Sequence, residues 1–284
     1  MKIIFIIPHY YGPGPSHYGS TGASLRTQRI ESLRTTITSL HQHLGNNQGM
    51  CCRGQNPKLP ATRRANQVIA NDIEVIICTT GDHHLVHELK LPDDSYRHVP
   101  VDVDNPLYLG FACYPLFKQA FGHYDWYCFL EDDVIISDPF FFLKLQTFYL
   151  TVQDTSFLLQ PNRFELDKNR MSKLYTDEQF EDARVMEKFR LPNSRPQIDL
   201  PFLGTTLRML PAENAHSGCF FLTTTHLEHL LQQSWYGKHD AGIYAGPLES
   251  AATLFIVTIF HVFKPAPECA GFLEVHHSHQ RYFK

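Results

Sequence analysis

Three acidic residues stand side by side near the middle of the chain, in the stretch WYCFLEDDVIISDPF. Glu131, Asp132 and Asp133 lie between two apolar runs, and a carboxylate buried there without a partner would be very costly. Carboxylates are also preferred ligands of hard divalent cations, whose remaining positions are filled by water or substrate phosphate. The triplet therefore suits a metal and phosphate site, but a motif this short is explained more simply as a solvated acidic turn unless its surroundings support the site.

The direction of these side chains follows from the strand that precedes them. If the strand continued through residue 133, Glu131 and Asp133 would point to one side of the sheet and Asp132 to the other, because side chains alternate. Two carboxylates would then share one side at a strand end. A metal bound to them could neutralise the charge that builds up on a diphosphate leaving group.

The elements that must position the triplet alternate between strands and helices. Unbroken apolar runs predict buried strands at 3–7, 73–79 and 126–130, with a short one at 99–103. Apolar residues at spacings of three and four predict helices at 25–44, ending at Gly45, and at 105–121. This order predicts an α/β fold with a mostly parallel sheet, in which ligands bind at the C-terminal ends of the strands. The triplet is at such an end.

The second half of the chain has a weaker pattern. Strands are expected at 157–160 and 218–222, a helix at 225–233, and a buried helix over the apolar run 251–263. Residues 46–66 show no period, and residues 163–215 are rich in charge and proline, with at most one helix expected near 177–188. We therefore expect one domain over 1–284, with a ligand-binding half at 1–155 and an elaborated half at 156–284.

Composition limits the classes of function. The chain has 284 residues, 43% of them hydrophobic, which excludes disorder. Its net charge of -4 gives no field that would attract nucleic acid. The seven cysteines are scattered without paired CxxC spacing, which favours a reducing compartment. The opening run stops at Pro8 and the later one is shorter than the about 20 residues of a membrane span, so we expect a cytoplasmic protein.

Three stretches resemble the nucleotide-sugar glycosyltransferases of the GT-A fold. Asn105 begins N-x-x-x-x-G, an apolar helix and then FGHYDWYCFLEDD, as in a helix and turn leading to a DxD-type acidic motif. The continuation EDDVIISDPFFFL looks like the EDD form of the N-acetylglucosaminyltransferase I type. RTQRIESL, from Arg26 to Leu33, is similar to the first helix of many members. The likeness covers roughly residues 1 to 150 and lies at the level of the fold.

The resemblance implies a single GT-A-like domain and roles for residues in its first half. Asp133 would bind the divalent metal, Mn²⁺ or Mg²⁺, and Glu131 and Asp132 would contact the ribose or sugar of the donor. The residues that would contact the nucleotide or its diphosphate are Pro8, His9, Tyr10, Asp82 and either Arg26 or Arg29. Asp82 departs from the more acidic turn that is common there. Each Arg is equally well explained as a solvated helix charge.

The resemblance also implies an acceptor side. Gly218, in AHSGCFFL, is similar to the glycine loop beside the donor sugar, although a tight turn explains it almost as well. Glu249 in the first turn of its helix would take the proton of the acceptor hydroxyl in an inverting enzyme, with Asp240 in reserve. A capping Glu is the alternative.

Three histidines near the end of the chain offer one more metal ligand. Val275-His276-His277 matches the Val-x-His context in which family members supply one, so His277 is chosen. On an extended strand His279 would share its face and is the second choice, whereas His276 would point away. His83, His84 and His87 have no carboxylate partner in sequence and are expected at the surface.

Together with the resemblance, these residues predict a metal-dependent transferase that moves a sugar from a nucleotide-diphosphate donor to a glycan or other hydroxyl acceptor. The donor expected first is a UDP-sugar. A sugar-phosphate nucleotidylyltransferase is the first alternative, and the loop after the first strand lacks the Gly-rich, basic stretch that would suit its triphosphate. A non-catalytic glycan-binding module is the second. The sequence leaves open the base, the sugar, the acceptor and whether configuration inverts.

Overall fold

The computed structural model describes residues 1–12, 22–51, 62–177, 191, 196–238, 246–278 and 282. A five-stranded sheet lies at the centre, with the order β13-β6-β1-β4-β5. Its strands are β1 (Lys2–Pro8), β4 (Asp72–Thr79), β5 (Arg97–Pro100), β6 (Trp126–Leu130) and β13 (Cys219–Thr223). All neighbours are parallel except β13, which pairs with β6 in the antiparallel sense. The predicted α/β fold with a mostly parallel sheet is confirmed.

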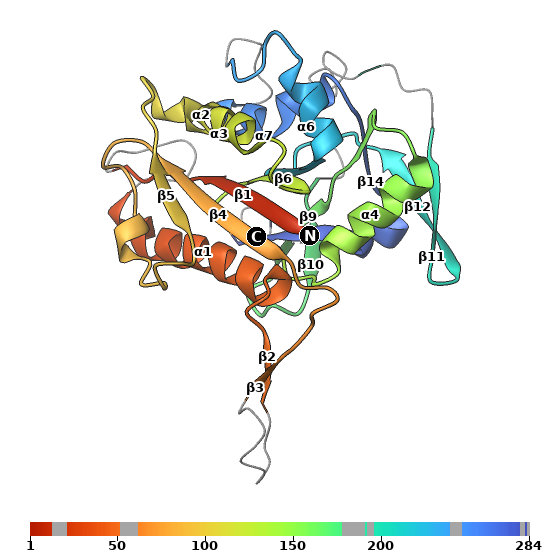
Figure 1. The fold of residues 1–284 in the computed structure, drawn as a ribbon, viewed down its shortest axis with the longest axis horizontal. Helices are drawn as coiled ribbons and strands as arrows, with labels where there is room; N and C mark the ends of the chain where they lie inside the picture. The colour runs from red at the N-terminus through yellow and green to blue at the C-terminus, as the bar shows by residue number, and fades with distance from the viewer. Residues whose placement is uncertain are drawn as a thin grey trace.

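The side chains of β1 divide the core into two layers. Ile3, Phe5 and Ile7 pack with one set of buried residues, and Ile4 and Ile6 with another. The first layer is covered by α1 (Arg26–Ser39) and α4 (Phe141–Val152), and the second by α2 (Leu109–Ala112), α3 (Tyr114–Ala120), α6 (Thr224–Leu231) and α7 (Pro247–Val257). Figure 1 shows α1 on the opposite side of the sheet from α2, α3, α6 and α7. A strand covered on both faces is apolar at every position, which explains the unbroken run in the sequence.

The first helix follows its predicted face. α1 runs into a π-helical turn, η2 (Leu40–Leu44), and the N–H of Gly45 bonds to the carbonyl of Leu40. Leu33, Ile37 and Leu40 are fully buried, as the spacing of three and four predicts. On this helix, Arg29 and Thr36 contact Asp132 of the acidic triplet.

Two smaller sheets complete the fold. One has the order β10-β9-β15-β7 and the other β11-β12-β14-β8. Their strands are β7 (Val134–Ile135), β8 (Phe157–Leu159), β9 (Asn162–Leu166), β10 (Lys173–Tyr175), β11 (Ile198–Phe202), β12 (Thr205–Pro211), β14 (His261–Pro265) and β15 (Glu274–His277). β15 pairs with both β7 and β9, so the end of the chain is beside the segment that follows the triplet.

Some predicted elements have other bounds. The expected helix at 105–121 is divided into η4 (Pro106–Tyr108), α2 and α3, and the short strand expected at 99–103 lies at β5. The expected strand at 157–160 and helix at 225–233 are present as β8 and α6, each within two residues of its predicted bounds.

Two predictions for the second half are wrong. The run 251–263 is not one helix, because α7 ends at Val257 and His261–Pro265 form β14, which pairs with β8 and β12. Periodicity alone cannot separate a buried strand from a buried helix in a short apolar run. Residues 163–215, expected to be irregular, hold β9 to β12. Most of the helix expected near 177–188 lies outside the described residues.

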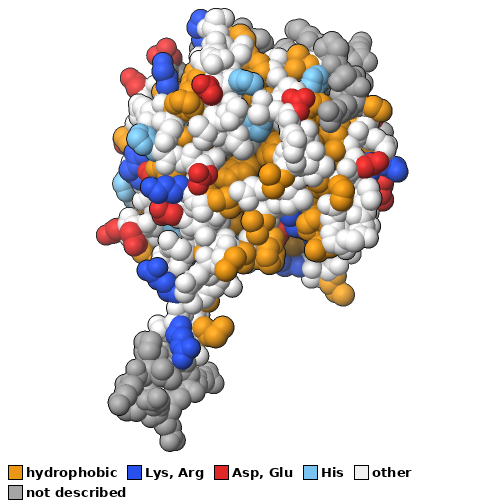
Figure 2. Space-filling view, turned by 45° about the vertical axis from the view of Figure 1, so that its right-hand side comes forward, with side chains coloured by type: hydrophobic (Ala, Val, Ile, Leu, Met, Phe, Trp, Pro, Cys, Tyr) orange, Lys and Arg blue, Asp and Glu red, His pale blue; other side chains and the backbone are white. Residues whose placement is uncertain are grey.

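The surface has two further features. A short hairpin, β2 (Gly49–Cys51) with β3 (Thr62–Arg64), projects from the body at the bottom of Figure 1, within the stretch expected to be aperiodic. Exposed hydrophobic side chains of α4 (Phe141–Val152) and of the β11–β12 turn include Leu150 and Leu203. In Figure 1, α4, β11 and β12 are on the right, the side that Figure 2 brings forward and on which hydrophobic side chains gather. No helix among the described residues is both long enough and apolar enough to cross a membrane.

Candidate functional site

The acidic triplet forms the turn between β6 and β7, at the C-terminal end of a central parallel strand. β6 ends at Leu130, so the three acids do not continue the strand and their side chains need not alternate between its two sides. The N–H of Val134 donates to the carbonyl of Glu131, which closes the turn (3.2 Å). The three carboxylates nevertheless separate. Asp132 contacts Arg29 on α1 and His9 directly after β1. Asp133 faces His277 on β15, and Glu131 lies beside the loop before β13.

Asp132 is enclosed by basic and polar groups. Its Oδ2 accepts from Nδ1 of His9 (2.5 Å) and from the guanidinium of Arg29, and Thr36 donates to its backbone carbonyl (3.2 Å). Nε2 of His9 accepts the N–H of Leu85 (3.2 Å), so the proton of a neutral ring is on Nδ1. Burial alone would raise the pKa of Asp132, but Arg29 and His9 hold it below its ordinary value. Asp132 therefore remains ionised and fixes Arg29.

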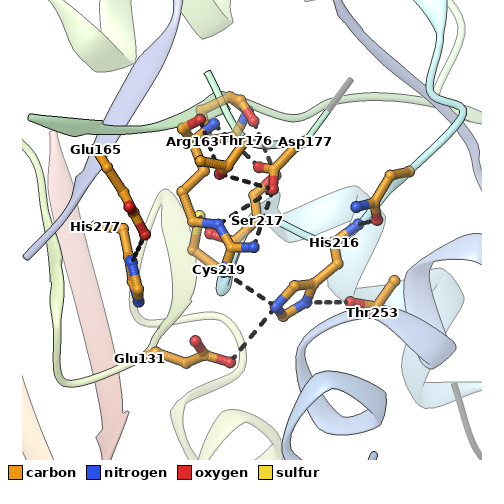
Figure 3. A network of polar contacts seen from close by, with 12 residues as sticks. Glu131, Arg163, Glu165, Thr176, Asp177, His216, Ser217, Cys219, Thr253 and His277 are labelled. Atoms are coloured by element: carbon orange, nitrogen blue, oxygen red, sulfur yellow. Dashed lines mark hydrogen bonds and ion pairs between the residues drawn. The ribbon is translucent and has the colours of Figure 1, made fainter. Parts of the chain in front are cut away.

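Asp133 is brought to a histidine from the far end of the chain. Its Oδ2 is 3.4 Å from Nε2 of His277 and 3.8 Å from a guanidinium nitrogen of Arg29. Nδ1 of His277 donates to Oε1 of Glu165 on β9 (3.0 Å), as Figure 3 shows. Burial would lower the pKa of His277, but Asp133 and Glu165 raise it to about 9. His276 stacks on Phe164 instead and points away from Asp133, as alternation predicts.

The Asp133–His277 pair fits a divalent cation. A carboxylate oxygen and an imidazole nitrogen 3.4 Å apart can both reach one ion at about 2.0–2.2 Å. The second ring nitrogen of His277 donates to a carboxylate, the arrangement found around metal-binding histidines. The described residues contain no cluster of three or more His, Cys, Asp or Glu suited to a metal. A cation here would therefore take its other ligands from water or a bound phosphate.

Glu131 lies against a glycine that leaves room for it. Its N–H donates to the carbonyl of Gly218 (2.8 Å), and a Cβ added at Gly218 would be 2.7 Å from Oε2 of Glu131. Gly218 also has a φ of +66°, which favours glycine. Oε1 of Glu131 faces Nε2 of His216 at 4.0 Å, as Figure 3 shows. A glycine at position 218 therefore both allows the backbone turn and leaves room for the side chain of Glu131.

Glu249 shares the surroundings of Glu131. It lies in the first turn of α7, and its Oε2 is buried without a hydrogen-bond partner among the described residues. Burial, Asp133 and Glu249 raise the pKa of Glu131 to about 8. Glu131 can therefore carry a proton near neutral pH.

A network of buried charges lies behind Glu131. Arg163 on β9 forms an ion pair with Asp177 (3.0 Å), and Nζ of Lys264 on β14 lies 3.3 Å from the same carboxylate. His216 lies 3.5 Å from Arg163 and 2.9 Å from Oγ1 of Thr253, as Figure 3 shows. Burial and Arg163 lower the pKa of His216 to about 3, so it is neutral at pH 7. This network forms one wall of a cavity of about 490 Å³ lined by Asp177 and Lys264.

The residues expected to contact the nucleotide lie along the ends of β1 and β4. Pro8 ends β1, and the loops after the two strands are joined by the N–H of Tyr11 donating to the carbonyl of His83 (2.8 Å). The ring of Tyr10 lies against His83 (5.7 Å between centroids). Asp82 is exposed in the turn after β4.

Arg26 and Arg29 have different surroundings. Arg26 is half-exposed, pairs with Glu88 and lies over the ring of Tyr11, 5.5 Å from its centroid. Arg29 is buried against Asp132. The structure thus brings Arg29, and not Arg26, to the triplet.

Some residues of this site were not singled out from the sequence. Arg163 and Glu165 belong to a segment expected to be irregular, although the order Arg-Phe-Glu-Leu alternates charged and apolar residues as a strand does. His216 is next to the glycine turn, but nothing marks it as buried. The reserve residues Asp240 and His279 lie outside the described residues. His83 and His87 are exposed as expected, whereas His84 is half-buried.

Comparison with known proteins gives only weak likenesses. No family model and no curated protein matches the chain. Among solved structures, TarS of S. aureus aligns with 98% of this chain and 37% of its own at 9% identity and a TM-score of 0.45. TarS 1-349 in complex with UDP-GlcNAc aligns over 99% and 59% at 10% identity and 0.41. The chain thus spans less than two thirds of either TarS structure.

A third solved structure is the galactosyltransferase LgtC with donor and acceptor sugar analogues. It aligns with 93% of this chain and 73% of its own at 11% identity and a TM-score of 0.37. Identities and TM-scores this low assign neither a fold family nor an activity to the chain.

Proposed function

We propose that the protein is a metal-dependent glycosyltransferase of the GT-A type, which moves a sugar from a nucleotide-diphosphate donor to an acceptor hydroxyl. One observation carries the proposal. Asp133, at the end of a central parallel strand, and His277, 144 positions later in the printed sequence (277 − 133), lie 3.4 Å apart with Arg29 beside them. This arrangement suits a metal-bound diphosphate at the edge where ligands of parallel sheets bind.

On the donor side, Asp133 and His277 are the proposed metal ligands. A divalent metal, Mn²⁺ or Mg²⁺, would supply positive charge to the diphosphate as it leaves. Between the two other acids of the triplet, Glu131 has the more exposed side chain, at 21% against 9% for Asp132. We assign to Glu131 the contact with a donor hydroxyl. We assign to Asp132 the role of holding Arg29 and His9 in a direction that faces the donor.

The nucleoside is assigned to the ends of β1 and β4, beside Pro8, Tyr10 and Asp82. These residues line the edge next to His9, so a nucleoside there would direct its diphosphate toward Asp133. Arg26 lies on the same loop side, over Tyr11. A UDP-sugar is the donor proposed for the first experiments.

On the acceptor side, Glu249 is the proposed general base. The acceptor hydroxyl would give its proton to Glu249 as its oxygen bonds to the anomeric carbon, and the bond from that carbon to the diphosphate oxygen would break with inversion. A buried carboxylate oxygen at a helix N-terminus, with no hydrogen-bond partner among the described residues, is suited to receive that proton. A glycan or another hydroxyl compound would be the acceptor.

Thermal unfolding with a panel of nucleotide sugars tests the proposal. A ligand that binds only the folded state raises its stability, so we expect a rise of several degrees with at least one UDP-sugar and Mn²⁺, and a smaller rise without metal. No shift with any nucleotide sugar, with or without metal, would contradict the proposal. Pyrophosphate release from a nucleoside triphosphate and a sugar phosphate would instead identify a nucleotidylyltransferase. Binding of a donor, with neither transfer nor hydrolysis of that donor, would favour a binding module.

A further inference from the structure

Glu165 is a fully buried carboxylate in the middle of strand β9. Its exposed fraction is 0%, and β9 is covered on both edges by β10 and β15. Both of its oxygens accept hydrogen bonds. Oε1 accepts from Nδ1 of His277 (3.0 Å), and Oε2 accepts the backbone N–H of Tyr282 (2.8 Å). Because burying a carboxylate is costly, these contacts need to account for its place in the strand.

The contact with Glu165 fixes how His277 presents its ring. Donation from Nδ1 to the carboxylate leaves Nε2 directed at Asp133, 3.4 Å from Oδ2. In a neutral ring it also places the proton on Nδ1, so that Nε2 carries the lone pair that a metal needs. Glu165 therefore acts on both the direction and the tautomer of the ring.

The backbone on either side of His277 is held as well. The N–H of Ser278 donates to the carbonyl of Asp133 (2.9 Å), and its hydroxyl lies 2.5 Å from that of Ser32 on α1. His277 itself pairs with Val134 of β7. With the backbone held by these contacts, the hydrogen bond from Nδ1 to Glu165 restrains the rotation of the His277 ring.

We propose that Glu165 is a positioning residue of the metal site, which orients His277 and holds it as an Nδ1–H donor so that Nε2 can bind a divalent cation with Asp133. This inference rests on the proposed function, because it requires a metal at Asp133 and His277. It assigns a role to a residue that would not itself touch metal or substrate.

A purely structural Glu165 would behave differently. If it only stabilised the C-terminal strand, its loss would lower the unfolding temperature and leave the affinity for metal in the folded protein unchanged. If it positions His277, the affinity for metal falls even where the fold is intact. Loss of such an outer carboxylate typically weakens metal binding by 10–100-fold.

The test is a titration of Mn²⁺ alone, and of Mn²⁺ with UDP, followed by the electron paramagnetic resonance signal of free Mn²⁺. Glu165→Gln keeps the shape of the side chain and removes its charge. Glu274→Gln is the matched control, since Glu274 is on β15 of the same sheet but bonds to Lys173 and Tyr175. We expect about 10–100-fold weaker Mn²⁺ binding for E165Q and unchanged binding for E274Q. The coupling of a ring ¹⁴N to bound Mn²⁺ should be present in wild type and lost in E165Q.

Each outcome decides one of the two proposals. If wild type binds Mn²⁺, Asp133→Ala does not, and E165Q binds as tightly as wild type, the positioning role is overturned and the metal site stands. If wild type does not bind Mn²⁺, or D133A binds it equally well, the metal site fails and this inference with it. Should E165Q not fold, Glu165→Asp replaces it. That variant keeps the buried charge but withdraws it from Nδ1, and the same loss of affinity is expected.

Discussion

Asp132 and Glu131 are neighbours in the chain, yet they lie in opposite electrostatic surroundings. Asp132 belongs to a cation-paired corner with His9 and Arg29, which hold its pKa below the ordinary value. Glu131 belongs to a carboxylate corner with Glu249, in which burial and the neighbouring acids raise its pKa to about 8. Among the described residues, no Lys or Arg nitrogen lies within 4.0 Å of Glu131.

The difference separates two kinds of chemistry in one short turn. A corner whose acids are ionised and paired suits fixed charge, such as a metal with a diphosphate. A corner whose acids are crowded together suits protons and hydroxyl groups, because a carboxyl with a raised pKa, such as that of Glu131, can carry a proton near neutral pH.

Breaking the cation-paired corner should give the largest loss of stability. Arg29→Met removes the buried partner of Asp132 and leaves that charge unpaired, which typically costs about 3–5 kcal/mol of the free energy of unfolding. Urea unfolding measures it. Arg26→Met is the matched control on the same helix, where the side chain is half-exposed, and its unfolding curve should overlay that of wild type. Equal curves for R29M and R26M would show that the corner does not hold the fold.

Removing the base from the carboxylate corner should affect turnover and not stability. Glu249→Gln keeps the shape of the side chain but cannot accept a proton, and a general base contributes about 10²–10⁴-fold to a rate. We expect transfer to fall by that factor, with donor affinity unchanged in thermal unfolding. Glu228→Gln, on the exposed surface of α6, is the control. Full transfer by E249Q would exclude Glu249 as the base and favour a retaining enzyme.

The packing of Glu131 against Gly218 can be tested by substitution of the glycine. Gly218→Ala adds a Cβ 2.7 Å from Oε2 of Glu131 at a φ of +66°, and the backbone strain alone costs about 1–2 kcal/mol. Gly204→Ala has the same kind of strain, at a φ of +81°, with nothing within 4 Å of the new Cβ. Both variants should lose stability in urea, G218A at least as much as G204A, and only G218A should lose transfer. Loss of transfer in both would trace the effect to strain.

A smaller effect should appear in the pH dependence of stability. The pKa of His216 is about 3 in the folded protein, below its ordinary 6.5, so its contribution is complete above pH 6.5 and is lost as pH falls toward 3. Over that window one proton accounts for about 1.4 kcal/mol per pH unit. Between pH 4.5 and 6.5, His216→Gln should therefore lose stability less steeply than wild type in urea unfolding. Parallel slopes would show that His216 does not resist protonation.

Much of the first half could be predicted because its signals are local. β1, α1, β4 and β6 follow from apolar runs and from the spacing of residues such as Leu33 and Ile37. The triplet could be placed at a strand end for the same reason. In the second half, β9 carries the buried charges Arg163 and Glu165, whose partners Asp177 and His277 lie on other segments, so the local sequence does not show that they are buried.

The site shows the same limit in its side chains. Asp133 and His277 could be named from motifs, but the sequence could not show that Glu165 fixes the ring of His277, since both strands must first pair. It also could not separate Arg26 from Arg29. They are three positions apart on one helix, and only the packed fold decides which of them is buried.

The most direct test of the proposed function measures nucleotide release from a UDP-sugar panel by wild type and by Asp133→Ala, with Mn²⁺ and after its removal with EDTA. The proposal predicts release by wild type that needs Mn²⁺ and returns when Mn²⁺ is restored. In D133A it should fall to the rate without enzyme while the unfolding curve stays that of a folded protein. Metal-dependent release by D133A at the rate of wild type would contradict the assignment of Asp133 and, with it, the proposed site.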